Sequence, residues 1–170
     1  MHTFQLAISW FDKTITTKLQ SLILLLLRLY IASIFLKSGI QKMTNWDGTL
    51  FLFEYEYHVP LLSIKLAAIL ATAAELILPV LLLLGLLTRC TALALFVFNA
   101  VAVLSYPTLW KGGWGLVMAF DRLPVGITFP TQGFEDHAVW AMMLLVVLCF
   151  GAGKIASDTL FLAKMKLNST

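Results

Sequence analysis

Four long apolar segments dominate the pattern of hydrophobic and polar positions along this chain of 170 residues. A helix needs about 20 mostly apolar residues to cross the hydrocarbon core of a bilayer, which is about 30 Å thick. The segments that meet this requirement are 21–40, 62–87, 90–109 and 137–155. We therefore predict an all-α polytopic membrane protein, with a bundle of four transmembrane helices formed by residues 21–158 as one domain.

Residues 1–20 show a different pattern. The apolar residues that recur there at three- and four-residue steps are Phe4, Ile8, Phe11, Ile15 and Leu19. Such a stripe is typical of a helix with one apolar face. An amphipathic helix on the membrane surface fits this pattern, and so does an extension of the first span; both readings stay open. Residues 159–170 are expected to form a tail.

The connections between the spans predict how the bundle is oriented. Thr88 and Arg89 alone join the second and third spans, so these two are expected to be antiparallel neighbours. Basic residues on the side of the termini and the short turn are Lys13, Lys18, Arg89, Lys154, Lys164 and Lys166. Those on the side of the two long loops are Lys42, Lys65, Lys111 and Arg122. Because cytoplasmic loops carry the excess of basic residues, we expect both termini in the cytoplasm.

Composition agrees with a lipid environment. Hydrophobic residues make up 60% of the chain and charged residues 12%, against about 25% charged in soluble domains. The net charge of +3 comes from scattered residues rather than from a basic run, so nucleic-acid binding is not predicted. The bilayer is the expected partner. The sequence contains neither a catalytic motif nor a metal-ligand spacing, and no metal is predicted.

Two ionisable residues deep in the spans are candidates for an intramembrane polar site. Glu75 lies about 13 Å into the apolar run of the second span, at 1.5 Å per residue. Arg28 lies at a similar depth in the first span, which runs the opposite way, so the two are expected to pair. Such a pair can fix the register of two helices, or it can bind a polar ligand group or carry a proton. Pro79 also frees the carbonyl of Glu75 from its helical hydrogen bond.

The end of the bundle with the long loops is the second candidate site, for a ligand or a partner protein. Its members are Lys37, Lys42, Trp46, Tyr55, Tyr57, His58, Trp110, Trp114, His137 and Trp140. Aromatic residues also gather at membrane interfaces as a matter of course, and Lys37 can reach the interface with its long side chain. His137 follows two acidic residues at the start of the fourth span, and a purely structural role also explains it.

Three stretches of the sequence, spread over the four segments, share a further pattern. They are Arg28–Lys42 with Gly39 inside it, Ala74–Pro79 followed by Gly85–Arg89, and His137–Trp140 followed by residues 151–158. In this order they resemble the DoxX/DoxD family of small bacterial membrane proteins. Ala152 stands where the family usually has proline.

The resemblance implies a four-helix membrane bundle in the inner membrane of a bacterium, with a link to redox chemistry. One branch of the family is the small, quinone-facing subunit of a thiosulfate:quinone oxidoreductase, and other members are membrane partners in oxidant defence or sulfur metabolism. It assigns no catalytic residue. The leading hypothesis is the membrane subunit of a redox system, with a quinone as cofactor and a periplasmic or membrane redox protein as partner. The alternatives are a non-catalytic anchor or assembly factor for a periplasmic protein, and a small proton-coupled transporter.

Overall fold

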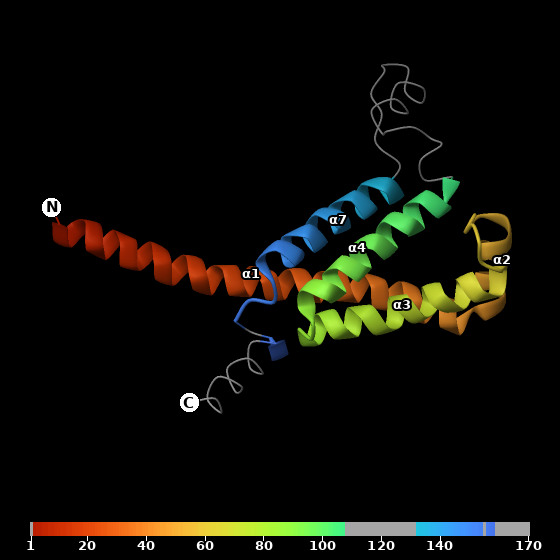
Figure 1. The fold of residues 1–170 in the computed structure, drawn as a ribbon, viewed down its shortest axis with the longest axis horizontal. Coiled ribbons are helices and arrows are strands. Elements are labelled where there is room, and N and C mark those ends of the chain that lie inside the picture. The colour runs from red at the N-terminus through yellow and green to blue at the C-terminus, as the bar shows by residue number, and fades with distance from the viewer. Residues whose placement is uncertain (1, 108–131, 155, 159–170) are drawn as a thin grey trace, which may run out of the picture.

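The computed structural model describes residues 2–107, 132–154 and 156–158, with side chains from residue 18 in the first helix and from residue 134 in the last. Every regular element in this part of the chain is a helix, which confirms the all-α prediction (Figure 1). The helices are α1 (His2–Thr44), α2 (Trp46–Tyr55), α3 (Ile64–Leu84), α4 (Thr88–Ser105) and α7 (Gln132–Phe150).

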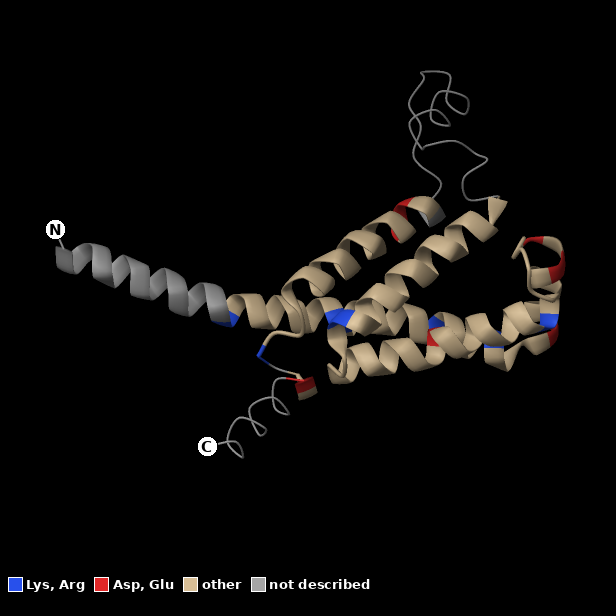
Figure 2. Ribbon diagram, in the orientation of Figure 1, with Lys and Arg blue, Asp and Glu red and all other residues tan. Residues whose placement is uncertain are grey.

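Three helical segments are long and apolar enough to cross a membrane: Lys18–Thr44 of α1, all of α3 and all of α4. They correspond to the first three predicted spans. Charged residues are sparse along them and more frequent at the end of the molecule that carries α2 (Figure 2). Large apolar side chains are exposed on their outer faces, for example Leu26, Ile77 and Val97. Such a surface suits a lipid solvent, and the protein is a membrane protein with apolar transmembrane helices.

The first helix is continuous from His2 to Thr44. Residues 2–20 are therefore the beginning of the same helix as the first span, and this part of α1 extends away from the other helices (Figure 1). At its other end α1 passes residue 40, where the span was expected to end. The connection 41–61 was expected to be a loop, but it contains the helix α2. Asn45 caps α2, because its side chain accepts a hydrogen bond of 3.2 Å from the amide of Gly48.

The turn between α3 and α4 comes earlier than predicted. Thr88 and Arg89 already belong to α4, and residues 85–87 make the turn. Gly85 ends α3 in the left-handed region with a φ of 68°. Its amide bonds to the carbonyl of Leu82, and the next amide, of Leu86, bonds to Leu81, which is the Schellman pattern of helix ends. The turn is short, so α3 and α4 are antiparallel neighbours as expected.

A segment from the far end of the chain holds this turn in place. α7 ends at Phe150, before the expected end of the span near residue 155, and Gly151 continues the chain with a φ of 76°. The carboxylate of Asp158 then accepts three hydrogen bonds of 2.8 Å, from the amides of Leu87 and Thr88 and from the Thr88 hydroxyl. Burial raises the pKa of Asp158, but these bonds and the nearby Arg28 outweigh it, so the pKa lies below its ordinary value. Asp158 thereby caps the N-terminus of α4.

The core lies where α1, α3, α4 and α7 meet. Its fully buried members are Leu24, Ile31, Phe35, Leu82, Ala92, Leu95, Leu144 and Val147. α7 lies beside α4 along much of its length (Figure 1). From the turn at residues 85–87, α3 and α4 diverge toward the end of the molecule that carries α2 (Figure 1). The segment between α2 and α3 contacts the end of α4 there, because the amide of His58 donates a 2.7 Å hydrogen bond to the carbonyl of Ser105.

Candidate functional site

A buried ion pair joins α1 to α3. The ammonium of Lys42 lies 2.8 Å from each carboxylate oxygen of Glu75 and 2.8 Å from the Ser38 hydroxyl. The exposed fractions of the Lys42 and Glu75 side chains are 13% and 9%. In a low-dielectric setting an ionised group is tolerated when it is paired and hydrogen-bonded, as both members are here.

Helix geometry explains why Lys42 reaches Glu75. Side chains tilt toward the N-terminus of their own helix. α1 and α3 are antiparallel, so the two side chains lean toward each other along the bundle. The backbones also approach closely at Gly39, where an added Cβ would lie 3.0 Å from the Cβ of Glu75. Gly39 is one turn before Lys42, which therefore spans that turn to meet the carboxylate.

The predicted pairing of Arg28 with Glu75 is not what the structure contains. Arg28 is almost fully buried and donates a hydrogen bond of 3.5 Å to the carbonyl of Leu82. Leu82 is seven residues from Glu75 on α3, or about 10 Å along the helix. Arg28 also tilts toward the N-terminus of α1, away from Glu75. Its guanidinium lies against Gly85, near Asp158, so Arg28 supports the turn between α3 and α4 instead.

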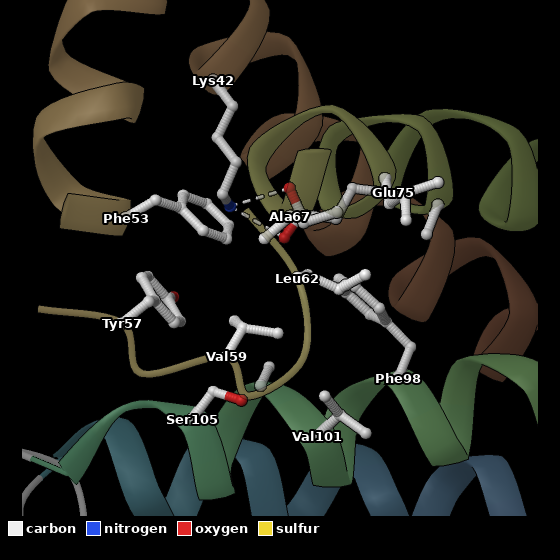
Figure 3. A pocket seen from close by; sticks show the side chains of 14 residues that line it. Lys42, Phe53, Tyr57, Val59, Leu62, Ala67, Glu75, Phe98, Val101 and Ser105 are labelled. Atoms are coloured by element: carbon white, nitrogen blue, oxygen red, sulfur yellow. Dashed lines mark hydrogen bonds and ion pairs between the residues drawn. The ribbon is translucent and has the colours of Figure 1, made fainter. Parts of the chain in front are cut away.

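A crevice of about 280 Å³ opens between α3 and α4, and the ion pair lies at one side of it (Figure 3). On α3 its wall includes three small side chains on one helical face, Ala67, Ala71 and Ala74. The opposite wall, on α4, carries Phe98, Val101, Ala102 and Ser105. Small residues on α3 leave room where the two helices diverge. The lining is otherwise almost entirely apolar, which is the usual composition of a small-molecule site with a few polar groups.

Exposed apolar side chains surround the crevice on the outside of the bundle. Leu62 and Leu70 belong to its lining on the α3 side and Val101 on the α4 side, and all three are exposed. In a bilayer this surface faces acyl chains. A lipid-soluble molecule therefore has a lateral route from the membrane to the Lys42–Glu75 pair.

An aromatic stack borders the crevice at the end that carries α2. The ring of Tyr57 stacks on Phe53 with centroids 4.8 Å apart and on Tyr106 with centroids 5.1 Å apart. Tyr57 and Phe53 both line the crevice. Burial, with the charges of Glu75 and Tyr106 in second place, raises the pKa of the Tyr57 hydroxyl to about 12. The phenol is therefore neutral at physiological pH and remains a hydrogen-bond donor.

The residues predicted for the outer-end site divide into several groups. Lys42 and Tyr57 line the crevice, and Trp46 packs against the small cluster of Phe53, Ala67 and Ala68 beside it. Lys37, Tyr55 and His58 are exposed. Trp110 and Trp114 lie outside the described residues.

His137 and Trp140 belong to the α4–α7 contact. The Nδ1 atom of His137 lies 2.6 Å from the side-chain oxygen of Asn99, whose amide nitrogen donates to the His137 carbonyl at 2.9 Å. This second bond orients the amide, so Nδ1 carries the proton. Trp140 contacts the His137 ring and the core residue Phe35. The hydrogen bonds between Asn99 and His137 join α4 to α7. His137 therefore has a structural role in helix packing.

Sequence reasoning missed most of the crevice wall. Ser105, Phe98 and the alanines of α3 carry no charge and match no motif. The spacing of Ala67, Ala71 and Ala74 by four and three residues is a signal that was present, since it puts three small side chains on one helical face. The partner of Glu75 was missed because the first helix continues past residue 40 and carries Lys42 within the bundle.

The fold and the crevice define a class: small helical membrane proteins with a polar pair at a lipid-facing crevice. The DoxX family model matches residues 23–108, half of the chain. The chain belongs to the DoxX family, which confirms the resemblance seen in the sequence. The match covers α3, α4 and the part of α1 that carries Arg28 and Lys42.

A relative from Haemophilus influenzae is 30% identical over 141 residues, which cover 81% of this chain and 82% of the relative. It is named only as an uncharacterized protein. The similarity therefore extends over most of both chains and assigns no activity. No solved structure gives a significant match.

Proposed function

We propose that this DoxX-family protein is a membrane subunit of a redox system and that it binds a lipid-soluble quinone in the crevice between α3 and α4. The observation that carries the proposal is the Lys42–Glu75 ion pair at the side of an apolar crevice that faces the lipid. Quinones dissolve in the bilayer and combine an apolar body with two polar oxygens. The crevice offers this same combination of apolar walls and a single charged pair.

The residues of the crevice fit such a molecule in three ways. Phe53, Tyr57 and Phe98 line the crevice with aromatic side chains, beside which a flat ring can pack. Glu75 and Lys42 supply a charged hydrogen-bonding group, which orients the polar oxygen. The volume of about 280 Å³ is at the small end of ligand sites, so a ring fits inside while an isoprenoid chain stays in the bilayer.

A bound quinone would supply the capacity to accept two electrons and two protons. The described part of this chain contributes binding, orientation and a local charge balance. Glu75 supplies a carboxylate that can accept a hydrogen bond or a proton at this site, and Lys42 compensates its charge. The electrons come from a partner, a periplasmic or membrane redox protein.

The transmembrane topology is part of the same proposal. α7 has 19 residues, or about 28 Å at 1.5 Å per residue, enough to span the hydrocarbon core. It packs beside α4, and it exposes Met142, Leu145 and Phe150. We take α7 as the fourth span, in the inner membrane of a bacterium. An even number of spans puts both termini on one side, and the distribution of Lys and Arg makes that side cytoplasmic.

The test is quinone reduction by membranes or purified complex, wild type against Glu75→Gln. The proposal predicts a loss of at least about tenfold in quinone-dependent turnover, because a charge-assisted hydrogen bond is worth about 1.5–3 kcal/mol. Lys37→Gln is the matched control, since Lys37 is exposed outside the crevice, and it should leave turnover unchanged. Unchanged kinetics and quinone binding in Glu75→Gln would contradict the proposal.

A second candidate, the anchor for a periplasmic partner, is favoured by one observation. Phe51 and Tyr55 form an exposed aromatic pair on α2, with exposed fractions of 62% and 60% and ring centroids 4.5 Å apart. Exposed aromatic residues are frequent at protein interfaces. This function predicts that Phe51→Ser with Tyr55→Ser abolishes co-purification of a partner while Glu75→Gln does not.

A further inference from the structure

The hydrogen bonds of the ion pair restrict what Lys42 can offer a ligand. An ammonium group has three N–H donors and no acceptor. In the structure these donors are directed to the Ser38 hydroxyl and to the two oxygens of Glu75, all at 2.8 Å. A ligand carbonyl, which needs a donor, can bind Lys42 only by displacing one of these partners.

Glu75, in contrast, can accept further hydrogen bonds. A carboxylate offers about four lone-pair positions to hydrogen-bond donors. Lys42 occupies one position on each oxygen, and the Ser38 hydroxyl also interacts with the carboxylate. At least one acceptor position remains, and Glu75 lines the crevice. A hydroxyl group that donates a proton can therefore bind without disturbing the pair.

The opposite wall adds a second polar group. Ser105 lines the crevice from α4, near Val59 and toward the end that carries Tyr57 (Figure 3). Within the described part of the chain, no side-chain hydrogen bond involves the Ser105 hydroxyl, and this hydroxyl can donate or accept. Aromatic rings lie along the same crevice, from Phe98 on α4 to Phe53 and Tyr57 at the other end. Glu75 and Ser105 thus give the crevice two polar positions that can bind hydroxyl groups.

From these donors and acceptors we infer that the crevice binds a lipid-soluble phenol of the hydroquinone type in preference to the quinone form of the same ring. A hydroxyl of the hydroquinone donates a hydrogen bond to Glu75. The inference rests on the proposed function for its choice of ring, and it adds which redox form the site holds. A site that retains the hydroquinone favours the reduced product over the oxidised substrate.

The test compares binding of three probes to the protein in lipid nanodiscs, with binding to empty nanodiscs subtracted. The probes are a decyl-substituted hydroquinone kept under argon, the corresponding quinone and the dimethyl ether of the hydroquinone. The wild-type protein should bind the hydroquinone at least about tenfold more tightly than either other probe, as expected for a hydrogen bond to a charged acceptor. Equal affinities for all three, or tighter binding of the quinone, would overturn the inference.

Variants identify the acceptor. Glu75→Gln should reduce the preference for hydroquinone over its dimethyl ether to a few-fold, because the charged acceptor is lost. Lys37→Gln, outside the crevice, should leave the preference intact. A full preference retained in Glu75→Gln assigns the effect to another group and contradicts the inference. The ether comparison in wild-type protein needs no variant, so it decides the matter even where Glu75→Gln does not fold.

Binding and turnover distinguish this inference from the proposed function. Selective hydroquinone binding without any quinone-dependent turnover would leave the inference standing and remove the redox role. Turnover that depends on Glu75, with no preference among the three probes, would contradict the inference and leave the redox role standing.

Discussion

Lys42 and Glu75 meet inside the bundle although they lie on helices that run in opposite directions. Their contact of 2.8 Å depends on the close approach of α1 and α3 at Gly39 and on the tilt of both side chains toward each other. The pair has no net charge, which limits the cost of placing it beside lipid. Its stability and its role in binding can be tested separately.

Removing one partner of the pair should destabilise the protein more than removing both. Lys42→Met leaves a buried carboxylate without its cation, which costs on the order of 3–5 kcal/mol. The double variant Lys42→Met with Glu75→Met should recover most of this loss, since buried pairs are often replaceable by apolar residues of similar size. Unfolding in mild detergent measures each variant. Equal losses for Lys42→Met and the exposed control Lys37→Met would contradict the buried pair.

The approach at Gly39 should not tolerate a larger side chain. An added Cβ would already lie 3.0 Å from atoms of Glu75 and Leu76, so Gly39→Leu has to separate α1 from α3 at a cost of about 1–3 kcal/mol or more. Ser33→Leu, at an exposed position of the same helix, is the matched control and should be nearly neutral. Thermal unfolding in detergent compares the two, and similar melting temperatures would argue against this contact.

The cap that Asp158 provides should make stability depend on pH. Asp158→Ala should cost about 0.5–2 kcal/mol at neutral pH, as loss of a helix cap does. The pKa of Asp158 is lowered in the folded protein, so its contribution is full above the ordinary value of about 4 and is lost as the pH falls through the lower folded value. Unfolding curves measured between pH 7 and pH 2 should therefore converge for wild type and variant at the acid end. A constant difference over this range would contradict the assignment.

Tyr57 should ionise later than ordinary tyrosines. Its pKa is raised to about 12, against about 10 for a free phenol. Absorbance titration of tyrosinate should show a step near pH 12 that is missing in Tyr57→Phe. Because the charge of Glu75 contributes to the shift, Glu75→Gln should move that step to lower pH. A Tyr57→Phe difference curve centred near 10 would contradict the buried aromatic stack.

Much of the fold follows from the sequence because hydropathy acts over whole segments. The lengths of α3 and α4 and the apolar part of α1 follow from runs of about 20 apolar residues, and the short α3–α4 turn follows from the lack of residues between two such runs. The helix α2 was missed because its ten residues are too few to cross a bilayer, although Asn45 and Asp47 form a recognisable helix start.

The site was predictable only in part, because depth along a helix does not determine its register. Counting residues placed Glu75 deep in the membrane, and it is buried. The count treated Arg28 as its neighbour, whereas the close contacts pair Gly39 with Glu75 and Gly85 with Arg28. Gly39, 11 residues after Arg28 on α1, therefore lies where Arg28 was expected, and Lys42 takes the place of Arg28 as the cation beside Glu75. This register is set by the packing of small residues such as Gly39, which hydropathy does not report.

Photolabelling tests the crevice itself most directly. An azido-substituted quinone, activated in nanodiscs that contain the protein, should label residues of the crevice wall on α3 and α4, identified by peptide mass. Ala71→Leu fills the crevice and should abolish this labelling, while Ala100→Leu, at an exposed position of α4 outside the crevice, should leave it unchanged. Labelling that falls elsewhere, or that persists at full strength in Ala71→Leu, would contradict a quinone site between α3 and α4.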